Sequence, residues 1–154
     1  MKNFDRILAP VDFSKCSRSA LNYAISLAHQ LGAKLRIVHI CEVPALVSPD
    51  LVVTIPDQPT QTISEWVRNE ADSGMAEFMA ELAIPDGVEI ETKLIAGDAP
   101  DRIAKEATEY DADLIVMGTH GRKGMAHLIM GSVAERTLRI APCPVLTIRS
   151  SEKE

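Results

Sequence analysis

Glycine is concentrated in one stretch of this sequence, MGTHGRKGMAHLIMGSVAERTL at residues 117–138. Gly118, Gly121, Gly124 and Gly131 are half of the eight glycines in the chain. A residue without a Cβ atom tolerates a positive φ and lets the main chain approach a ligand closely. Successive bare N–H groups can also form a concavity that binds anions. The stretch therefore predicts a loop that cradles phosphate groups.

The residues that follow these glycines strengthen the phosphate interpretation. Gly131 and Ser132 stand directly before VAERTLRI, a predicted helix whose free N–H groups and positive dipole end would favour phosphate. The Ser132 hydroxyl can donate to the same oxygen, and Arg122 and Lys123 add positive charge nearby. The alternative is a flexible loop followed by a helix that Ser132 merely caps.

Other candidates for chemistry are fewer. No GxxxxGK[ST] loop is present, and no GxGxxG follows the first predicted strand, which ends instead in Pro10-Val11-Asp12. Asp12 could accept hydrogen bonds from a sugar or base, or hold a metal ion near phosphates; alternatively, it caps the first helix together with Ser14. His120 and His127 have no cysteine or carboxylate at metal spacing, so we expect solvated or phosphate-facing side chains.

Short apolar runs alternate with helical patterns along the chain. Strands are predicted at residues 6–11, 34–40, 88–95, 113–118 and 144–148, and helices at residues 14–31, 62–83, 97–110 and 132–141. Thr62 and Glu65 form a capping box, and Pro100 suits the first turn of its helix. Residues 42–60 hold four of the nine prolines and no helical period, which predicts a long loop.

This alternation predicts the α/β class: a single-domain open parallel five-stranded sheet with helices on both faces, Rossmann-like, over residues 1–150, with a polar tail at 151–154. Because parallel crossovers are right-handed, covering both faces favours the strand order 3-2-1-4-5. Ligands bind at the carboxyl ends of such strands where the order reverses, here between the first and fourth strands. Asp12 and the glycine stretch follow those two strands.

Several motifs together resemble the universal stress proteins. Gly118-x2-Gly121-x9-Gly131-Ser132 reproduces the G-x2-G-x9-G-[ST] signature of the ATP-binding branch of that family, and RILAPVDFS, LRIVHI and GSVAERTLRIAPCPVLTIR extend the similarity over nearly the whole chain. The resemblance implies a cytoplasmic homodimer that binds ATP, or ADP or AMP, with Mg²⁺ or Mn²⁺.

The resemblance also implies the residues of a nucleotide site. The base and sugar end would be lined by Pro10, Val11, Asp12 and Ile40. The floor would be formed by Met117, Gly118, His120 and Gly121, and the phosphates would be held by Gly131, Ser132 and Val133, with Arg122 adding positive charge.

Composition limits the other classes of function. The net charge of −6 argues against nucleic acid or an anionic membrane as the main partner. The N-terminal stretch MKNFDRILAPVDF carries charges throughout and has no signal-peptide apolar region, and no run approaches the roughly 18 apolar residues of a membrane span. Three widely spaced cysteines without a CxxC pair fit a reducing cytosol.

The last strand, Val145 to Ile148, is predicted at an edge of the sheet, where an open apolar strand invites pairing with a second copy of the chain. The alternative is that the charged tail RSSEKE shields this edge. For the activity, we favour a nucleotide-binding regulatory protein over a slow ATPase or phosphotransferase that uses Asp12 and a divalent metal. A scaffold that never binds nucleotide would leave the glycine spacing unexplained.

Overall fold

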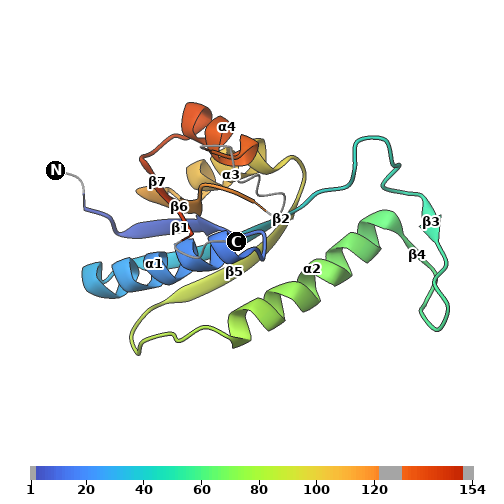
Figure 1. Ribbon diagram of the computed structural model, residues 1–154, viewed down its shortest axis with the longest axis horizontal. Coiled ribbons are helices and arrows are strands. Elements are labelled where there is room, and N and C mark those ends of the chain that lie inside the picture. The colour runs from blue at the N-terminus through green and yellow to red at the C-terminus, as the bar shows by residue number, and fades with distance from the viewer. Residues whose placement is uncertain (1–2, 122–129, 151–154) are drawn as a thin grey trace.

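A five-stranded parallel sheet forms the centre of the protein, whose computed structural model describes residues 3–121 and 130–150 (Figure 1). Across the sheet the strands are β5 (Ile90–Ala96), β2 (Lys34–Cys41), β1 (Arg6–Pro10), β6 (Leu114–Gly118) and β7 (Val145–Ile148). All four neighbouring pairs are parallel. Counted along the chain, this is the predicted order 3-2-1-4-5, so β1 and β6 flank the point where the order reverses.

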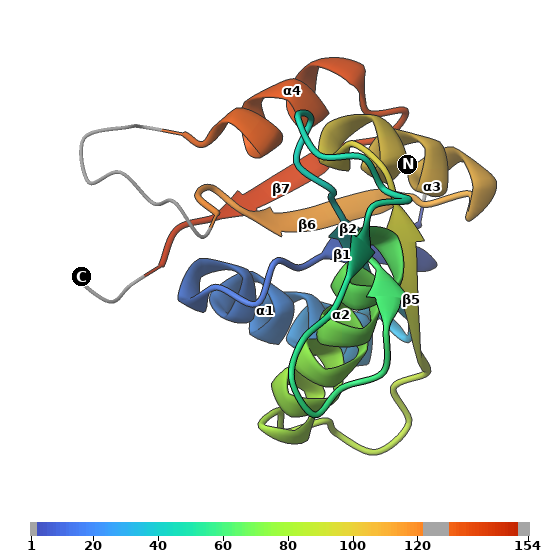
Figure 2. The ribbon, with the colours of Figure 1, turned by 90° about the vertical axis from the view of Figure 1, so that its right-hand side faces the viewer.

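Helices cover both faces of the sheet, as predicted (Figure 2). One face carries α1 (Lys15–Leu31) and α2 (Ile63–Ala80), and the other carries α3 (Ala99–Glu109) and α4 (Ser132–Ile140). Because successive side chains of a strand point to opposite faces, β1 contributes Ile7 and Ala9 to one apolar core and Leu8 to the other.

Local sequence explains where the helices begin and end. The Ser14 side chain accepts a hydrogen bond from the Ser17 N–H at the start of α1, and Gly32 ends that helix in the left-handed conformation at φ 64°. Both hydrogen bonds of the predicted Thr62–Glu65 capping box are present at the start of α2. These caps place the boundaries within a few residues of the predicted ones.

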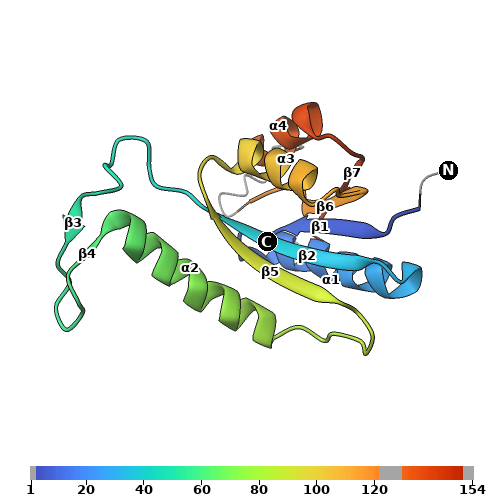
Figure 3. The same cartoon turned by 180° about the vertical axis from the view of Figure 1, so that it is seen from behind.

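The segment predicted as a loop at residues 42–60 contains one element that the sequence did not reveal. Strand β3 (Val52–Val53) pairs antiparallel with β4 (Gln61–Thr62), directly before α2. Figure 3 shows this segment and the first half of α2 projecting away from the sheet. We call residues 42–62 the arm; its Leu46, Leu51 and Val52 side chains are exposed.

A buried carboxylate joins α3 to the sheet. Glu106 is 2% exposed, and it accepts hydrogen bonds from Arg36 Nη1 at 2.7 Å and from Lys93 Nζ at 2.9 Å. The Arg36 guanidinium also pairs with Glu91 at 2.8 Å and lies 4.0 Å from the centre of the Tyr110 ring. Burial alone would raise the pKa of Glu106, but the hydrogen bonds from Lys93 and Arg36 outweigh it and hold that pKa below its usual value.

No helix in residues 3–121 and 130–150 combines the length and apolar character needed to cross a membrane.

Candidate functional site

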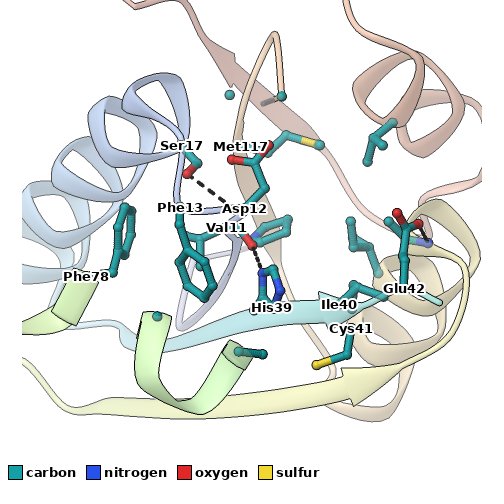
Figure 4. A pocket seen from close by; sticks show the side chains of 18 of the residues that line it. Val11, Asp12, Phe13, Ser17, His39, Ile40, Cys41, Glu42, Phe78 and Met117 are labelled. Atoms are coloured by element: carbon teal, nitrogen blue, oxygen red, sulfur yellow. Dashed lines mark hydrogen bonds between the residues drawn. The ribbon is translucent and has the colours of Figure 1, made fainter. Parts of the chain in front are cut away.

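A large cavity opens at the carboxyl ends of β1, β2 and β6, with a volume of about 1150 Å³ (Figure 4). It lies where the strand order reverses, which is the expected ligand position in an open parallel sheet. The cavity is lined by eleven of the twelve predicted site residues: Pro10, Val11, Asp12, Ile40, Met117, Gly118, His120, Gly121, Gly131, Ser132 and Val133. The twelfth, Arg122, lies outside the described residues, as do Lys123, Gly124 and His127.

The cavity reaches both faces of the sheet. Ile40, Met117 and Val133 belong to the core on the α3 and α4 side, whereas Phe13 and Phe78 belong to the core on the α1 and α2 side. Three of the predicted apolar residues therefore lie on the α3 and α4 side, whereas Val11 belongs to the core on the α1 and α2 side. The aromatic lining of the other side was not predicted.

Asp12 lies in the turn between β1 and α1, held by the start of the helix. Its N–H donates to Ser17 Oγ at 3.4 Å, and its Oδ1 accepts from the Ser14 N–H at 3.0 Å. Ser14 is itself the N-cap of α1, so the reading of Asp12 as the helix cap is wrong. Its second carboxylate oxygen, Oδ2, would lie 2.8 Å from a Cβ atom built on Gly121. The carboxylate thus contacts the glycine segment at the centre of the cavity.

The glycines are required for close approach and not for an unusual φ. A Cβ atom on Gly118 would lie 2.9 Å from Cys16 Sγ and 3.2 Å from the Cys16 carbonyl, and one on Gly131 would lie 3.2 Å from the Thr119 carbonyl oxygen. None of Gly118, Gly121 and Gly131 has a positive φ, so that part of the expectation is wrong. Bare backbone brings the end of β6, the first turn of α1 and the start of α4 together.

The N-terminus of α4 forms one wall of the cavity. Gly131 is its N-cap, so the alternative of Ser132 as the cap is wrong, and within residues 3–121 and 130–150 no side-chain cap is present. The Gly131 N–H already donates to the Thr119 carbonyl at 2.6 Å. The first-turn N–H groups of Ser132, Val133 and Ala134 have no acceptor within the helix, and the dipole favours an anion beside them. Within the described lining of the cavity, this first turn is the part whose chemistry suits an anion.

His120 is half-buried in the cavity wall, and its Nδ1 lies 2.9 Å from the Thr119 hydroxyl. The described ranges 3–121 and 130–150 contain no cluster of three or more histidine, cysteine or acidic side chains that could hold a metal ion.

Sequence reasoning missed two residues beside Asp12. His39 Nδ1 lies 2.8 Å from the Val11 carbonyl oxygen, and the Phe13 ring stacks on the His39 ring with centroids 4.3 Å apart. Phe13 lies in the stretch RILAPVDFS and His39 in LRIVHI, but no rule of sequence spacing connects residue 13 with residue 39. Their contact depends on the register in which β1 pairs with β2.

The protein-family model described as "Universal stress protein family" matches residues 3–149 of this chain. Universal stress protein MJ0531 of Methanocaldococcus jannaschii is 32% identical over 98% of this chain and 85% of its own length. Universal stress protein YxiE of Bacillus subtilis is 30% identical over 95% of this chain and 99% of its own length.

Solved structures give the same family. Universal stress protein UspA from Lactobacillus plantarum has a TM-score of 0.79 and 25% identity, covering 97% of this chain and 100% of its own. Two more distant structures, both 23% identical, are a universal stress protein in complex with cAMP and one from Archaeoglobus fulgidus in complex with dAMP; their TM-scores are 0.60 and 0.59. The cAMP complex covers 97% of this chain and 100% of its own length, and the dAMP complex covers 96% of this chain and 99% of its own length. With a family match over nearly its whole length and curated relatives at 30% identity or more, this chain belongs to the universal stress protein family.

Proposed function

We propose that the cavity binds an adenine nucleotide, ATP or the related ADP or AMP, and that the protein is a nucleotide-binding regulatory homodimer of the cytoplasm. The observation that carries the proposal is the first turn of α4, which begins at a glycine N-cap, has no side-chain cap among the described residues and lines the same cavity as Asp12. Uncapped N–H groups at a helix N-terminus favour phosphate. The two more distant relatives that were solved with cAMP and dAMP support an adenine nucleotide as the ligand.

The residues of the cavity fit the parts of such a ligand. Ile40, Met117 and Val133 offer an apolar wall for the base, and Asp12 offers a carboxylate for the sugar or for a metal ion. Ser132 and Val133 would hold the phosphates through their N–H groups and the Ser132 hydroxyl. A Cβ atom would lie 2.8 Å from Asp12 Oδ2 at Gly121 and 3.2 Å from the Thr119 carbonyl oxygen at Gly131, so bare backbone at these positions allows the segments that line the cavity to approach one another.

A divalent ion, Mg²⁺ or Mn²⁺, would accompany ATP. Asp12 would be the residue that holds it, and the ion would shield the charge of the phosphates. The other carboxylates that line the cavity are differently placed: Glu42 Oε1 accepts from the Ala99 N–H, Glu70 and Glu77 come from α2, and Glu81 is the C-cap of that helix. This distribution supports binding over the alternative function, a slow ATPase or phosphotransferase that uses Asp12 and the metal ion.

The homodimer would form through β7. Val145, Leu146, Thr147 and Ile148 are all partly exposed, and among the described strands β7 pairs only with β6, so no described strand covers its other side. Two copies related by a two-fold axis could pair these edges and cover both.

Thermal unfolding tests the proposal directly. Saturating ATP with Mg²⁺, at about 100 times its Kd, adds roughly 2.7 kcal/mol to the free energy of unfolding. For a chain of this length that corresponds to a rise in Tm of about 5–10 °C. GTP serves as the control for the base, and an unchanged Tm together with no heat in calorimetric titration would refute nucleotide binding.

A further inference from the structure

We propose that Phe13 and His39 form a positioning pair that holds the Asp12 carboxylate in its binding orientation. The inference rests on the proposed function, since it assigns Asp12 a part in holding the nucleotide or its metal ion. It concerns two residues that do not themselves need to touch the ligand.

The first observation is the backbone of Phe13. Its φ is 65°, in the left-handed region that a bulky side chain rarely adopts. The other two non-glycine residues with positive φ in the described ranges are Asp57 and Asp111, and aspartate tolerates this region better than phenylalanine does. The turn sends two neighbouring side chains in opposite directions: in Figure 4 the Asp12 carboxylate and the Phe13 ring point to opposite sides of the chain. Disfavoured backbone of this kind concentrates at functional sites.

The second observation is that His39 contacts both neighbours of Asp12. Its Nδ1 lies 2.8 Å from the Val11 carbonyl oxygen, and its ring stacks on Phe13 with a centroid distance of 4.3 Å and an interplanar angle of 19°. One imidazole on the buried strand β2 therefore holds the residue before Asp12 and the residue after it. Rotation of the Asp12 backbone would have to break one of these contacts.

The third observation is a glycine within α2. A Cβ atom on Gly74 would lie 2.9 Å from Phe13 Cε2, so the helix is kept bare where the ring meets it. Glycine is disfavoured in a helix interior, which makes its presence here informative. The ring also meets Phe78 at 5.5 Å, and the Arg18 guanidinium lies 4.3 Å from the Phe78 ring centre. Phe13 is thus held by α2 and β2 together.

These contacts determine where Asp12 points. Oδ1 stays 3.0 Å from the Ser14 N–H, and Oδ2 lies beside Gly121. If the Phe13 ring moves, the φ of 65° loses the packing that maintains it, and the carboxylate turns away from the glycine segment. The nucleotide affinity then falls, although no group that binds the nucleotide has been removed.

A double-mutant cycle with calorimetric titration of Mg·ATP tests the proposal on the full-length protein. Asp12→Asn and Phe13→Ala should each weaken binding by about tenfold, the size expected when one hydrogen bond to a charged group is lost. Because Phe13 acts through Asp12, the double variant should bind no more weakly than Asp12→Asn alone. Phe13→Tyr keeps the stacked ring and should bind ATP as the wild type does.

Gly74→Ala places a methyl group of α2 against the Phe13 ring and changes no residue next to Asp12 in the chain. Alanine favours the helix, so the Tm of the unliganded protein should hold or rise while ATP binding weakens by about threefold or more. The matched control is Asp72→Ala, an exposed position on the same helix that does not line the cavity and should leave ATP binding unchanged.

Two results would overturn the inference: additive losses in the cycle, or wild-type ATP affinity in both Phe13→Ala and Gly74→Ala. If Phe13→Ala does not fold, the ATP affinities of Gly74→Ala and Phe13→Tyr still test the inference: the first should be weakened and the second should equal that of the wild type. A wild-type protein that does not bind ATP refutes the proposed function itself, and that result is read before any variant is made.

Discussion

Glu106→Gln should destabilise the protein more than any exposed carboxylate on the same helix. The substitution keeps the size of the side chain but removes the charge that two cations share, Arg36 at 2.7 Å and Lys93 at 2.9 Å. The glutamine amide has only one oxygen that can accept hydrogen bonds from the two cations. Its NH₂ group would face a cation at a position where Glu106 is 2% exposed.

The size of the destabilisation depends on which partners the two cations, Arg36 and Lys93, retain in the variant. Removing one partner of a buried ion pair costs about 3–5 kcal/mol because a charge is left uncompensated. Here Arg36 retains Glu91 at 2.8 Å, and the Lys93 side chain is 43% exposed and can turn to water. We therefore expect a loss at or just below the lower limit of that range, about 2–3 kcal/mol, or a fall in Tm of about 5–10 °C.

The assay is thermal or urea unfolding at one fixed protein concentration, since dimerisation would make the Tm concentration-dependent. Glu109→Gln is the control: that side chain is 51% exposed and pairs only with Lys105 at 3.7 Å among the described ion pairs, so it should change stability by no more than about 0.5 kcal/mol. Equal midpoints for Glu106→Gln and the wild type would refute the reasoning.

The same variant has a defined pH dependence. The pKa of Glu106 is lowered in the folded protein, so its charge stabilises the fold fully above the unfolded pKa of about 4.3. That contribution is lost as the pH falls through the lower pKa of the folded state. The difference between wild type and Glu106→Gln should therefore be largest near neutral pH and shrink in acid.

Two predictions concern the nucleotide cavity. Ser132→Ala should weaken ATP binding by roughly ten- to a hundred-fold in calorimetric titration. Gly121→Val or Gly131→Val should abolish binding, because a Cβ atom there would lie 2.8 Å from Asp12 Oδ2 or 3.2 Å from the Thr119 carbonyl oxygen and would displace the residues around the proposed phosphate site. All three variants should remain dimers by light scattering, since no residue of β7 lines the cavity. Folded dimeric valine variants that bind ATP normally would contradict the proposed phosphate site. ATP hydrolysis by the wild type should be far slower than the roughly 1–100 s⁻¹ of kinases, and a rate in that range that Asp12→Asn abolishes would favour the enzymatic alternative.

The sheet and the position of the site could be predicted because they depend on local patterns and chirality. Five apolar runs separated by helical periods permit few right-handed topologies, and the one that covers both faces brings Asp12 and Gly131 to the same edge of the sheet. The caps at Ser14 and Thr62 were equally accessible, since their hydrogen bonds join residues three apart in the chain.

What the sequence could not predict depends on register and on side-chain reach. Strands β3 and β4 pair over two residues each, too short for any period to be recognised. The partners of Glu106 come from β2 and β5, 70 and 13 residues away, and became identifiable only once these strands were aligned. The sequence identified Gly118 as part of the cavity lining, but one reason for glycine at this position is the close approach of Cys16, which the spacing of the glycines does not indicate.

The base of the arm closes on itself. The Ile63 N–H donates to the Leu51 carbonyl at 2.8 Å and the Ser64 N–H to the Pro49 carbonyl at 3.0 Å, while Val52 and Val53 pair with Thr62 and Gln61. Residues 54–60 therefore leave and re-enter the protein at neighbouring points, and their number can change at little entropic cost. This makes the tip of the arm a natural insertion point, where a peptide tag or a small reporter domain can be grafted without passing strain to the sheet.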